Sequence, residues 1–139
     1  MKNWVGSAGV CVNAQGELLM VLQGKPEEEK KWSVPSGGQE RGETLEECCK
    51  REVYEETGYH AEIIDKLFVK YTELDGYNIE VHYFSIRIVG GKAVIQDPDQ
   101  LIHEIAWVTK DALKEIELAF PEDHDVLLHQ MENVDLLKK

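Results

Sequence analysis

The chain has 139 residues, of which 42% are hydrophobic and 30% charged, and its formal net charge is −12 at pH 7. This length and composition are typical of a soluble globule with one hydrophobic core, so we expect residues 1–139 to form a single domain. The negative charge argues against nucleic acids and anionic membranes as main partners, although bound cations could still recruit an anionic small molecule.

The first predicted elements are strands. Residues 6–12 and 18–23 are apolar or alternating, flank the turn sequence NAQG, and are predicted to form a hairpin. The charged loop GKPEEEKK follows, and WSVPSGGQERGE then predicts a short strand that enters a glycine-rich turn. Such a turn allows the backbone to approach a ligand closely, and here it leads into the N-terminus of a helix.

The next element is predicted to be a helix that opens at Thr44. Glu47 stands three residues later, which is a capping-box pattern, and Gly58 stands where a left-handed residue commonly ends a helix. Residues 59–73 and 77–89 are predicted strands joined through LDG, and EIAWV predicts another strand. TKDALKEI and PEDHDVLLHQM predict two further helices. This order predicts an α/β or α+β fold with a mixed sheet flanked by helices.

The predicted helix after Thr44 carries three glutamates within five positions, at Glu52, Glu55 and Glu56. At about 100° per residue, Glu52 and Glu56 fall within the apolar stripe. The opposite side carries Glu46, Glu47, Lys50, Tyr54 and Thr57. Carboxylates that are gathered and desolvated are costly, and a divalent cation such as Mg²⁺ or Mn²⁺ removes this cost. The alternative is a solvated acidic helix in which Arg51 pairs with Glu47 and Glu55.

Residues 37–59 resemble the Nudix box, G-x5-E-x7-R-E-U-x-E-E-x-G-U, where U is a bulky apolar residue. The fixed letters are filled by Gly37, Glu43, Arg51, Glu52, Glu55, Glu56 and Gly58. Val53 fills the first apolar position and Tyr59 the second, where an aliphatic residue is more usual. On these residues the chain is identified as a member of the Nudix hydrolase superfamily (MutT-like), which implies the family's α/β/α sandwich.

The resemblance implies a metal-dependent pyrophosphohydrolase that cleaves the diphosphate linkage of a nucleoside di- or triphosphate derivative, as in the housecleaning of nucleotides. The cofactor would be Mg²⁺ or Mn²⁺, held by Glu52, Glu55, Glu56 and the backbone carbonyl of Gly37. Held cations would neutralise the phosphate oxygens and lower the pKa of a bound water.

The resemblance assigns a supporting role to two further residues of the box. Glu43 and Arg51 are expected to form an inward ion pair that orients the catalytic loop on the helix, with a surface role for Arg51 as the alternative.

The general base is left open by the resemblance. Glu52 or Glu55 could serve, and so could a carboxylate outside the box, where the segment DPDQLIHEIAWV supplies Asp97, Asp99 and Glu104. Glu104 begins the predicted EIAWV strand, shortly before Trp107, at a position where the family often carries an acidic residue, and a solvated glutamate at the end of a strand is the equal alternative.

The substrate is the least determined part of the prediction. The ADP-ribose subgroup places a proline about where Leu74 and Asp75 stand, which counts against ADP-ribose. The dinucleoside polyphosphate subgroup carries a tyrosine near this distance, so Tyr77 is a candidate substrate-binding residue, and ordinary hairpin packing is its alternative reading. Nucleoside triphosphates remain the default. A nucleotide-sensing module without catalysis and an RNA-decapping enzyme are the rival functions.

The remaining expectations concern the setting of the protein. The three cysteines, Cys11, Cys48 and Cys49, form no CxxC motif and cannot all pair, which favours a reduced, cytoplasmic location. No apolar run approaches the roughly 20 residues that span a bilayer, and no signal-peptide core is present. We expect a small nucleotide as partner, no nucleic acid or membrane, and a monomer or homodimer.

Overall fold

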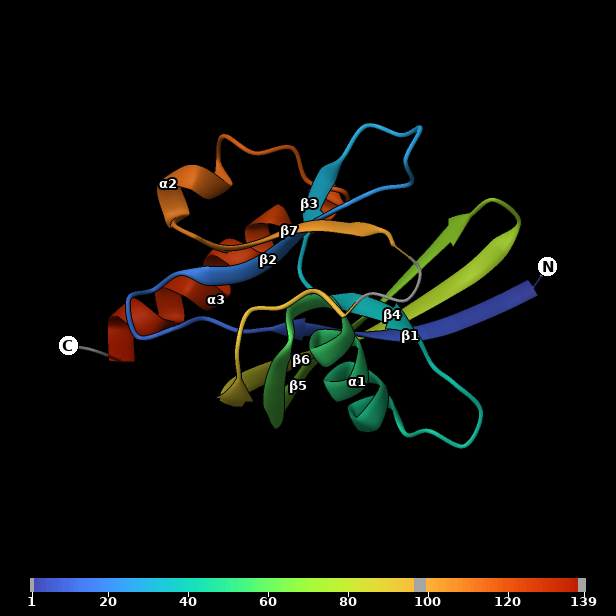
Figure 1. The fold of residues 1–139 in the computed structure, drawn as a ribbon, viewed down its shortest axis with the longest axis horizontal. Coiled ribbons are helices and arrows are strands. Elements are labelled where there is room, and N and C mark those ends of the chain that lie inside the picture. The colour runs from blue at the N-terminus through green and yellow to red at the C-terminus, as the bar shows by residue number, and fades with distance from the viewer. Residues whose placement is uncertain (1, 97–99, 138–139) are drawn as a thin grey trace.

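The computed structural model describes residues 2–96 and 100–137, in which two β-sheets have helices on both sides (Figure 1). The strands are β1 (Lys2–Val10), β2 (Leu18–Gln23), β3 (Lys31–Ser33), β4 (Ser36–Gly38), β5 (Tyr59–Leu74), β6 (Tyr77–Gly91) and β7 (Ile102–Val108). The helices are α1 (Leu45–Thr57), α2 (Lys110–Leu113), the 3₁₀ turn η1 (Pro121–Asp123) and α3 (His124–Leu137).

The larger sheet is mixed and has the strand order β4-β1-β6-β5, with β1 and β6 parallel. The smaller sheet is antiparallel and has the order β3-β2-β7. In Figure 1, α1 lies against the larger sheet, whereas α2 and α3 lie on the side of β2 and β7. The predicted α+β sandwich of mixed sheet and flanking helices is therefore confirmed.

The predicted hairpin of residues 6–12 and 18–23 is wrong in its pairing. Both strands form, but β1 pairs with β4 and β6, whereas β2 pairs with β3 and β7. A single bridge between Val12 and Leu18 is the link between them in the described residues. Asn13 shapes the turn, because its side-chain oxygen accepts hydrogen bonds from the backbone N–H of Gln15 and Glu17. The chain crosses here from one sheet to the other, which a local alternation of apolar residues cannot indicate.

The predicted hairpin of residues 59–73 and 77–89 is confirmed as β5 and β6. Asp75 and Gly76 join the strands with φ values of 52° and 83°. Two successive left-handed residues match the twist of a tight hairpin, which is why an Asp-Gly pair suits this place. The tip of the hairpin extends beyond the body of the molecule beside the N-terminal half of β1 (Figure 1).

Helix α1 begins and ends as predicted. Thr44 caps it, with the reciprocal hydrogen bonds between Thr44 and Glu47 that define a capping box, and Gly58 ends it at φ 81°. A Cβ on Gly58 would lie 2.3 Å from the carbonyl oxygen of Lys92, so a glycine is required by space as well as by backbone angle. The expectation that Thr57 faces solvent is wrong: it is buried, and its hydroxyl donates to the Val53 carbonyl oxygen at 2.7 Å.

The hydrophobic core occupies both faces of β2, because neighbouring residues of a strand point to opposite sides. Leu18 and Met20 pack with the cluster toward α2 and α3. Leu19 packs instead with Cys49 and Val53 of α1. This packing holds α1 firmly against the sheets, so its remaining inward side chains have fixed positions.

The C-terminal helices differ in detail from the prediction. The helix predicted at residues 109–116 is confined to α2, with Thr109 as its N-cap. Pro121 begins the 3₁₀ turn η1 rather than α3 itself. Within residues 2–96 and 100–137, no helix combines the length and the apolar character needed to cross a bilayer.

Candidate functional site

The inward glutamates of α1 lie where the helical periodicity predicts. Glu56 is 8% exposed, and the Glu52 side chain is 14% exposed. Glu56 Oε1 accepts a hydrogen bond from the backbone N–H of Ser36 at 3.3 Å, and Glu52 is hydrogen-bonded to Glu56. The side chain of Glu55 is 28% exposed at the rim of the same face. Three carboxyl groups are thus gathered on the side of α1 that faces β4.

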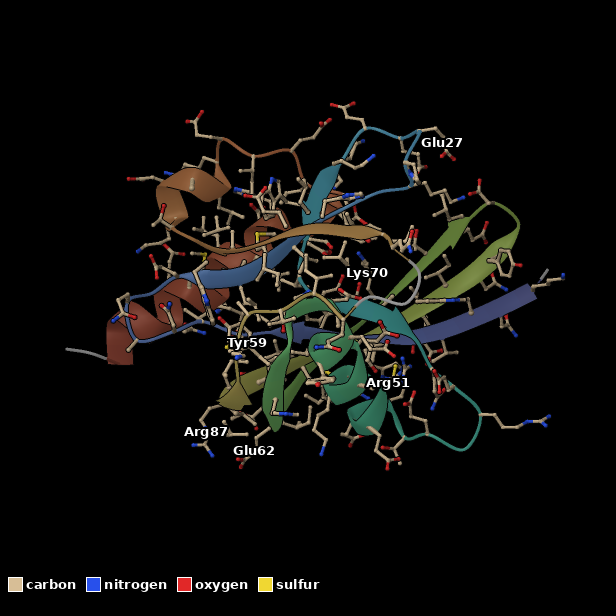
Figure 2. The ribbon with its side chains drawn as sticks, viewed as in Figure 1. Glu27, Arg51, Tyr59, Glu62, Lys70 and Arg87 are labelled. Carbon is tan, nitrogen blue, oxygen red and sulfur yellow. The ribbon has the colours of Figure 1, made fainter. Side chains whose placement is uncertain are left out.

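Arg51 offsets part of this negative charge from within the helix (Figure 2). Its Nε and Nη2 atoms donate to the two carboxylate oxygens of Glu43, at 2.6 and 3.0 Å. Its Nη1 donates to Glu52 Oε1 at 2.6 Å and to Glu55 Oε2 at 3.0 Å. Nη2 also donates to the Gly38 carbonyl oxygen at 2.8 Å. The guanidinium therefore joins α1 to the glycine-rich turn while it holds three carboxylates.

The sequence left two roles open for Arg51, an inward ion pair with Glu43 or a surface role, and this network distinguishes between them. The bidentate pair with Glu43 is present as expected, and it is the stronger, planar form of ion pair that only arginine makes. Of the alternative, in which Arg51 pairs with Glu47 and Glu55, the structure shows only the pair with Glu55, because the Glu47 carboxylate accepts the backbone N–H of Thr44 in the capping box.

The ionisation of these groups follows from their surroundings. Desolvation raises the pKa of Glu52, and the hydrogen bonds from Glu56 and Arg51 only partly counter it. The hydrogen bonds from Arg51 hold the pKa of Glu43 below its usual value, although desolvation acts in the opposite direction. Burial raises the pKa of the Cys48 thiol to about 11, so this cysteine is a packing residue and no thiolate.

Gly37 fits tightly between the turn and α1. A Cβ at this position would lie 2.2 Å from Cδ of Glu52, and a Cβ at Gly6 of β1 would lie 2.3 Å from the Gly37 carbonyl oxygen. The same carbonyl oxygen accepts a weak hydrogen bond from Cys48 Sγ at 3.5 Å. Glycine at position 37 thus allows the turn to approach the glutamates to contact distance.

These elements enclose a cavity of about 340 Å³, which we call the acidic cavity. It is lined by Trp4, Gln23, Ser36, Gly37, Gly38, Glu52, Glu55, Glu56, Leu101 and Ile102. Its volume lies at the lower end of the range of about 300–1,000 Å³ that is usual for ligand pockets. The box supplies the carboxylates and the turn, whereas β1, β2 and the start of β7 supply the opposite wall.

The donor chemistry of the acidic cavity fits a hard divalent cation. Three carboxylates line one wall, and the desolvation that raises the pKa of Glu52 is a cost that a cation would remove. No group of three His, Cys, Asp or Glu side chains within residues 2–96 and 100–137 is already spaced to hold a metal ion. Nη1 of Arg51 contacts one oxygen of Glu52 and one of Glu55, so the second oxygen of each carboxylate would remain for a cation.

Other residues selected from the sequence lie apart from the cavity. Glu104 is an exposed residue of β7, paired with Leu22, and does not line the acidic cavity. Tyr77 begins β6 next to the hairpin tip and is likewise absent from the lining, so its role in substrate binding stays a prediction. The candidate bases Asp97 and Asp99 lie outside the described residues.

Sequence reasoning did not identify part of the wall of the acidic cavity. Trp4 and Gln23 line it from β1 and β2, Ile102 lines it from the first position of β7, and Leu101 lines it from just before that strand. These residues are distant from the box in sequence and belong to no motif. Trp4 lies near the box because β1 pairs with β4, and Gln23 lies beside Ile102 because β2 pairs with β7.

Comparisons with known proteins agree with this fold and with the box. The family model described as "NUDIX domain" matches residues 2–130. The chain is 33% identical over 108 residues to a protein named "Putative 8-oxo-dGTP diphosphatase" of Bacillus subtilis, covering 78% of this chain and 68% of that protein. It is 32% identical over 114 residues to the "ADP-ribose pyrophosphatase" of the same organism, covering 79% of this chain and 61% of that protein.

A solved structure resembles nearly the whole chain. It is titled "NUDIX hydrolase from Nitrosomonas europaea" and has a TM-score of 0.79 at 23% identity, covering 99% of this chain and 91% of that one. At this identity the likeness shows the fold alone. The first curated relatives that the chain matches are longer, and it spans only 30% and 32% of their length.

Proposed function

The chain belongs to the NUDIX family, and from this premise we propose that it is a pyrophosphohydrolase that uses Mg²⁺ or Mn²⁺ to cleave the diphosphate linkage of a nucleoside di- or triphosphate derivative. The observation that carries the proposal is the acidic cavity, where Glu52, Glu55 and Glu56 share one wall with the glycine-rich turn. A merely structural helix would not keep several carboxylates on its inward face, since their desolvation costs stability.

We propose that residues 1–139 act as one catalytic domain, which the family match over residues 2–130 supports. In this domain, Glu52, Glu55, Glu56 and the Gly37 carbonyl oxygen would hold the cation, which supplies charge neutralisation of the phosphates and a more acidic water. Gly37 and Gly38 present backbone that can approach the diphosphate, because no side chain intervenes.

The remaining chemistry belongs to side chains of the box. Arg51 positions the turn by holding Glu43 and the Gly38 carbonyl oxygen together. Glu55 is the best placed proton acceptor for the attacking water, because it lines the cavity and is the most exposed of the three glutamates of α1. Glu104 remains the alternative base outside the box.

The relatives leave the substrate open. One is named for a guanine nucleotide and the other for an adenine nucleotide, at almost equal identity. The absence of a proline near residues 74–75 counts against ADP-ribose, and nucleoside triphosphates are the default substrates. A dinucleoside polyphosphate remains the alternative that Tyr77 would serve. We also propose a small nucleotide as the partner and a cytoplasmic location, in accordance with the reduced cysteines.

The proposal is tested by a phosphate- and pyrophosphate-release screen over nucleoside triphosphates, ADP-ribose and dinucleoside polyphosphates with Mg²⁺ or Mn²⁺. We expect turnover that EDTA abolishes and that Glu52→Gln reduces strongly. Glu46→Gln is the matched control, because Glu46 lies on the exposed face of the same helix. Tight nucleotide binding with no turnover on any substrate would identify a sensing module instead.

A further inference from the structure

Two neighbouring cysteines of α1 have different surroundings, although both are buried. Cys49 packs with Leu19 and Val53 in a hydrophobic cluster, and a Cβ on Gly9 would lie 3.3 Å from its Sγ atom. Cys48 is 0% exposed, yet it is a member of neither hydrophobic cluster that the described residues form. The apolar core therefore explains a small apolar side chain at position 49, but it does not explain position 48.

Polar groups of the glycine-rich turn and of α1 surround the Cys48 thiol. Its Sγ donates a hydrogen bond to the Gly37 carbonyl oxygen at 3.5 Å, and Nη2 of Arg51 donates to the same Sγ at 3.9 Å. Desolvation raises the pKa of the Cys48 thiol to about 11, so at neutral pH the thiol keeps the proton that it donates. Cys48 therefore links the turn to the helix as a neutral group.

Gly37 is in contact with two successive turns of α1. Cys48 precedes Glu52 by four residues, so both side chains lie on the same face of the helix. The Glu52 carboxyl group lies beside the Cα of Gly37, where a Cβ would be 2.2 Å from Cδ of Glu52. The Cys48 thiol holds the carbonyl oxygen of the same glycine. One turn of the helix thus fixes the Cα of Gly37, and the preceding turn fixes its carbonyl oxygen.

We propose that Cys48 is a positioning residue for the cation, because its thiol fixes the direction of the Gly37 carbonyl oxygen. The inference rests on the proposed function, which makes this oxygen one of the ligands. A carbonyl oxygen has two lone pairs, so it can accept from the thiol and still bind a cation. A thiol is a weak donor and leaves the oxygen most of the negative charge that a hard cation requires.

Arg51 acts on the next carbonyl group of the turn. Its Nη2 donates to the Gly38 carbonyl oxygen at 2.8 Å, and the same guanidinium holds Glu43. Each of the two carbonyl groups therefore has its own donor on α1, the thiol for Gly37 and the guanidinium for Gly38. Because only the Gly37 oxygen is assigned to the cation, a change at Cys48 should weaken metal binding, whereas Arg51→Lys should act on the placement of the turn.

The test compares the two cysteines, with alanine and serine at each position of the full chain. The Mn²⁺ affinity is measured by titration, with electron paramagnetic resonance to determine the free ion. We expect Cys48→Ala to weaken Mn²⁺ binding about fivefold, which is the scale of one neutral hydrogen bond. Cys48→Ser supplies a hydroxyl donor in place of the thiol and should bind Mn²⁺ within about twofold of the unaltered protein.

The matched controls are Cys49→Ala and Cys49→Ser, because Cys49 is as deeply buried but packs in the apolar cluster. Both should leave the Mn²⁺ affinity unchanged. Thermal melts in EDTA measure the packing that is lost at each position, which separates a loss of stability from a loss of metal binding. Cys48→Val fills the space but cannot donate, and it repeats the test if Cys48→Ala folds poorly.

Three results would overturn the role of Cys48. These are an unchanged Mn²⁺ affinity in Cys48→Ala or Cys48→Val, equal losses in Cys48→Ala and Cys48→Ser, and a loss in Cys49→Ala that equals the loss in Cys48→Ala. The expected order of affinities without hydrolysis of any substrate in the screen would overturn the proposed function instead, and the role of Cys48 would stand. A failure of the unaltered protein to bind Mn²⁺ would overturn both.

Discussion

The acidic cavity meets a second cavity of about 270 Å³ at Trp4 and Ser36, and we call this second one the aromatic cavity because the rings of Trp4, Tyr83 and Phe120 line it. The two cavities are built in opposite ways. In the acidic cavity, the charged groups come from one helix and one turn, and Arg51 alone joins four of the surrounding acceptors. In the aromatic cavity, the walls come from β1, β4, β5, β6 and the segment before α3. The charged side of the acidic cavity is thus a local unit of the chain, whereas the walls of the aromatic cavity come from segments that are far apart in sequence.

This difference suggests a division of labour in the proposed reaction. Chemistry on the diphosphate is the same whatever group it carries, so it requires one rigid set of residues. Recognition of the attached group needs only that a second cavity lies within reach. Each cavity has a carboxylate–cation pair associated with it, Glu43 with Arg51 behind the glutamates of the acidic cavity and Glu122 with Lys70 on the wall of the aromatic cavity, but only the first pair is bidentate. Variants in the two cavities should therefore have separable effects.

The largest expected effect follows from Glu56→Gln in the acidic cavity. The amide keeps the shape of the side chain and removes a charge from a group that is 8% exposed. We expect kcat to fall by about 100-fold or more, which is typical for the loss of one preorganised electrostatic group. The measurement is turnover on the best substrate of the screen at saturating Mn²⁺, with circular dichroism to confirm the fold. A near-normal kcat would contradict the assignment of Glu56 as a metal ligand, and the acidic cavity would then not be the more sensitive of the two to a single substitution.

A smaller effect is expected from Arg51→Lys. Lysine keeps the positive charge but cannot make the paired hydrogen bonds to Glu43 while it also reaches the Gly38 carbonyl oxygen. The turn should loosen, and kcat should fall by about tenfold to 100-fold through mispositioning. Mn²⁺ affinity should stay nearly normal in a titration. If affinity collapsed while kcat at saturating metal was unchanged, Arg51 would act on the ion site and not on position.

The same contrast explains what could be predicted from the sequence. The inward face of α1 was predictable because helical periodicity places Glu52 and Glu56 among apolar residues. The capping box and the Asp75-Gly76 turn were predictable because their hydrogen bonds and backbone angles depend on neighbours in the chain. The placement of β1 and β2 in different sheets was not predictable, since the alternation of apolar residues does not determine which strand another strand pairs with.

The aromatic cavity shows most clearly what could not be predicted from the sequence. Trp4, Lys70 and Phe120 approach one another through parallel pairing of β1 with β6 and through the fold of the segment after α2. No spacing rule connects positions so far apart in the chain. The strand β4 was also missed, because three residues with two glycines carry no strand pattern. Their extended form depends on the hydrogen bonds that β1 provides.

A moderate effect on stability is expected from metal ions. A ligand that binds only the folded state raises the free energy of unfolding by about 2.7 kcal/mol at a hundredfold excess over Kd. We expect thermal melts at neutral pH to show a higher Tm in Mn²⁺ than in EDTA, by about 5–10 °C for a chain of this size. Glu56→Gln should lose most of this shift, whereas Glu122→Gln should retain it. A shift that was lost in both variants would mean that the two cavities share one metal-binding unit.

The smallest expected effect compares the two carboxylate–cation pairs as the pH falls. The pKa values of Glu43 and Glu122 both lie below the ordinary value of 4.5, so each contributes stability above that pH and loses it as the pH falls through its lower value in the folded protein. The Glu43 side chain is 13% exposed and makes two hydrogen bonds to Arg51, whereas Glu122 is 53% exposed and shares one lysine with Asp123. Solvent screens the exposed pair more strongly. We therefore expect Glu43→Gln to lower the urea midpoint at pH 7 more than Glu122→Gln does, and both differences from the unaltered protein should shrink below about pH 4. A Glu122→Gln loss equal to that of Glu43→Gln would show that the aromatic cavity is built as rigidly as the acidic one, and the division of labour between them would then lack its physical basis.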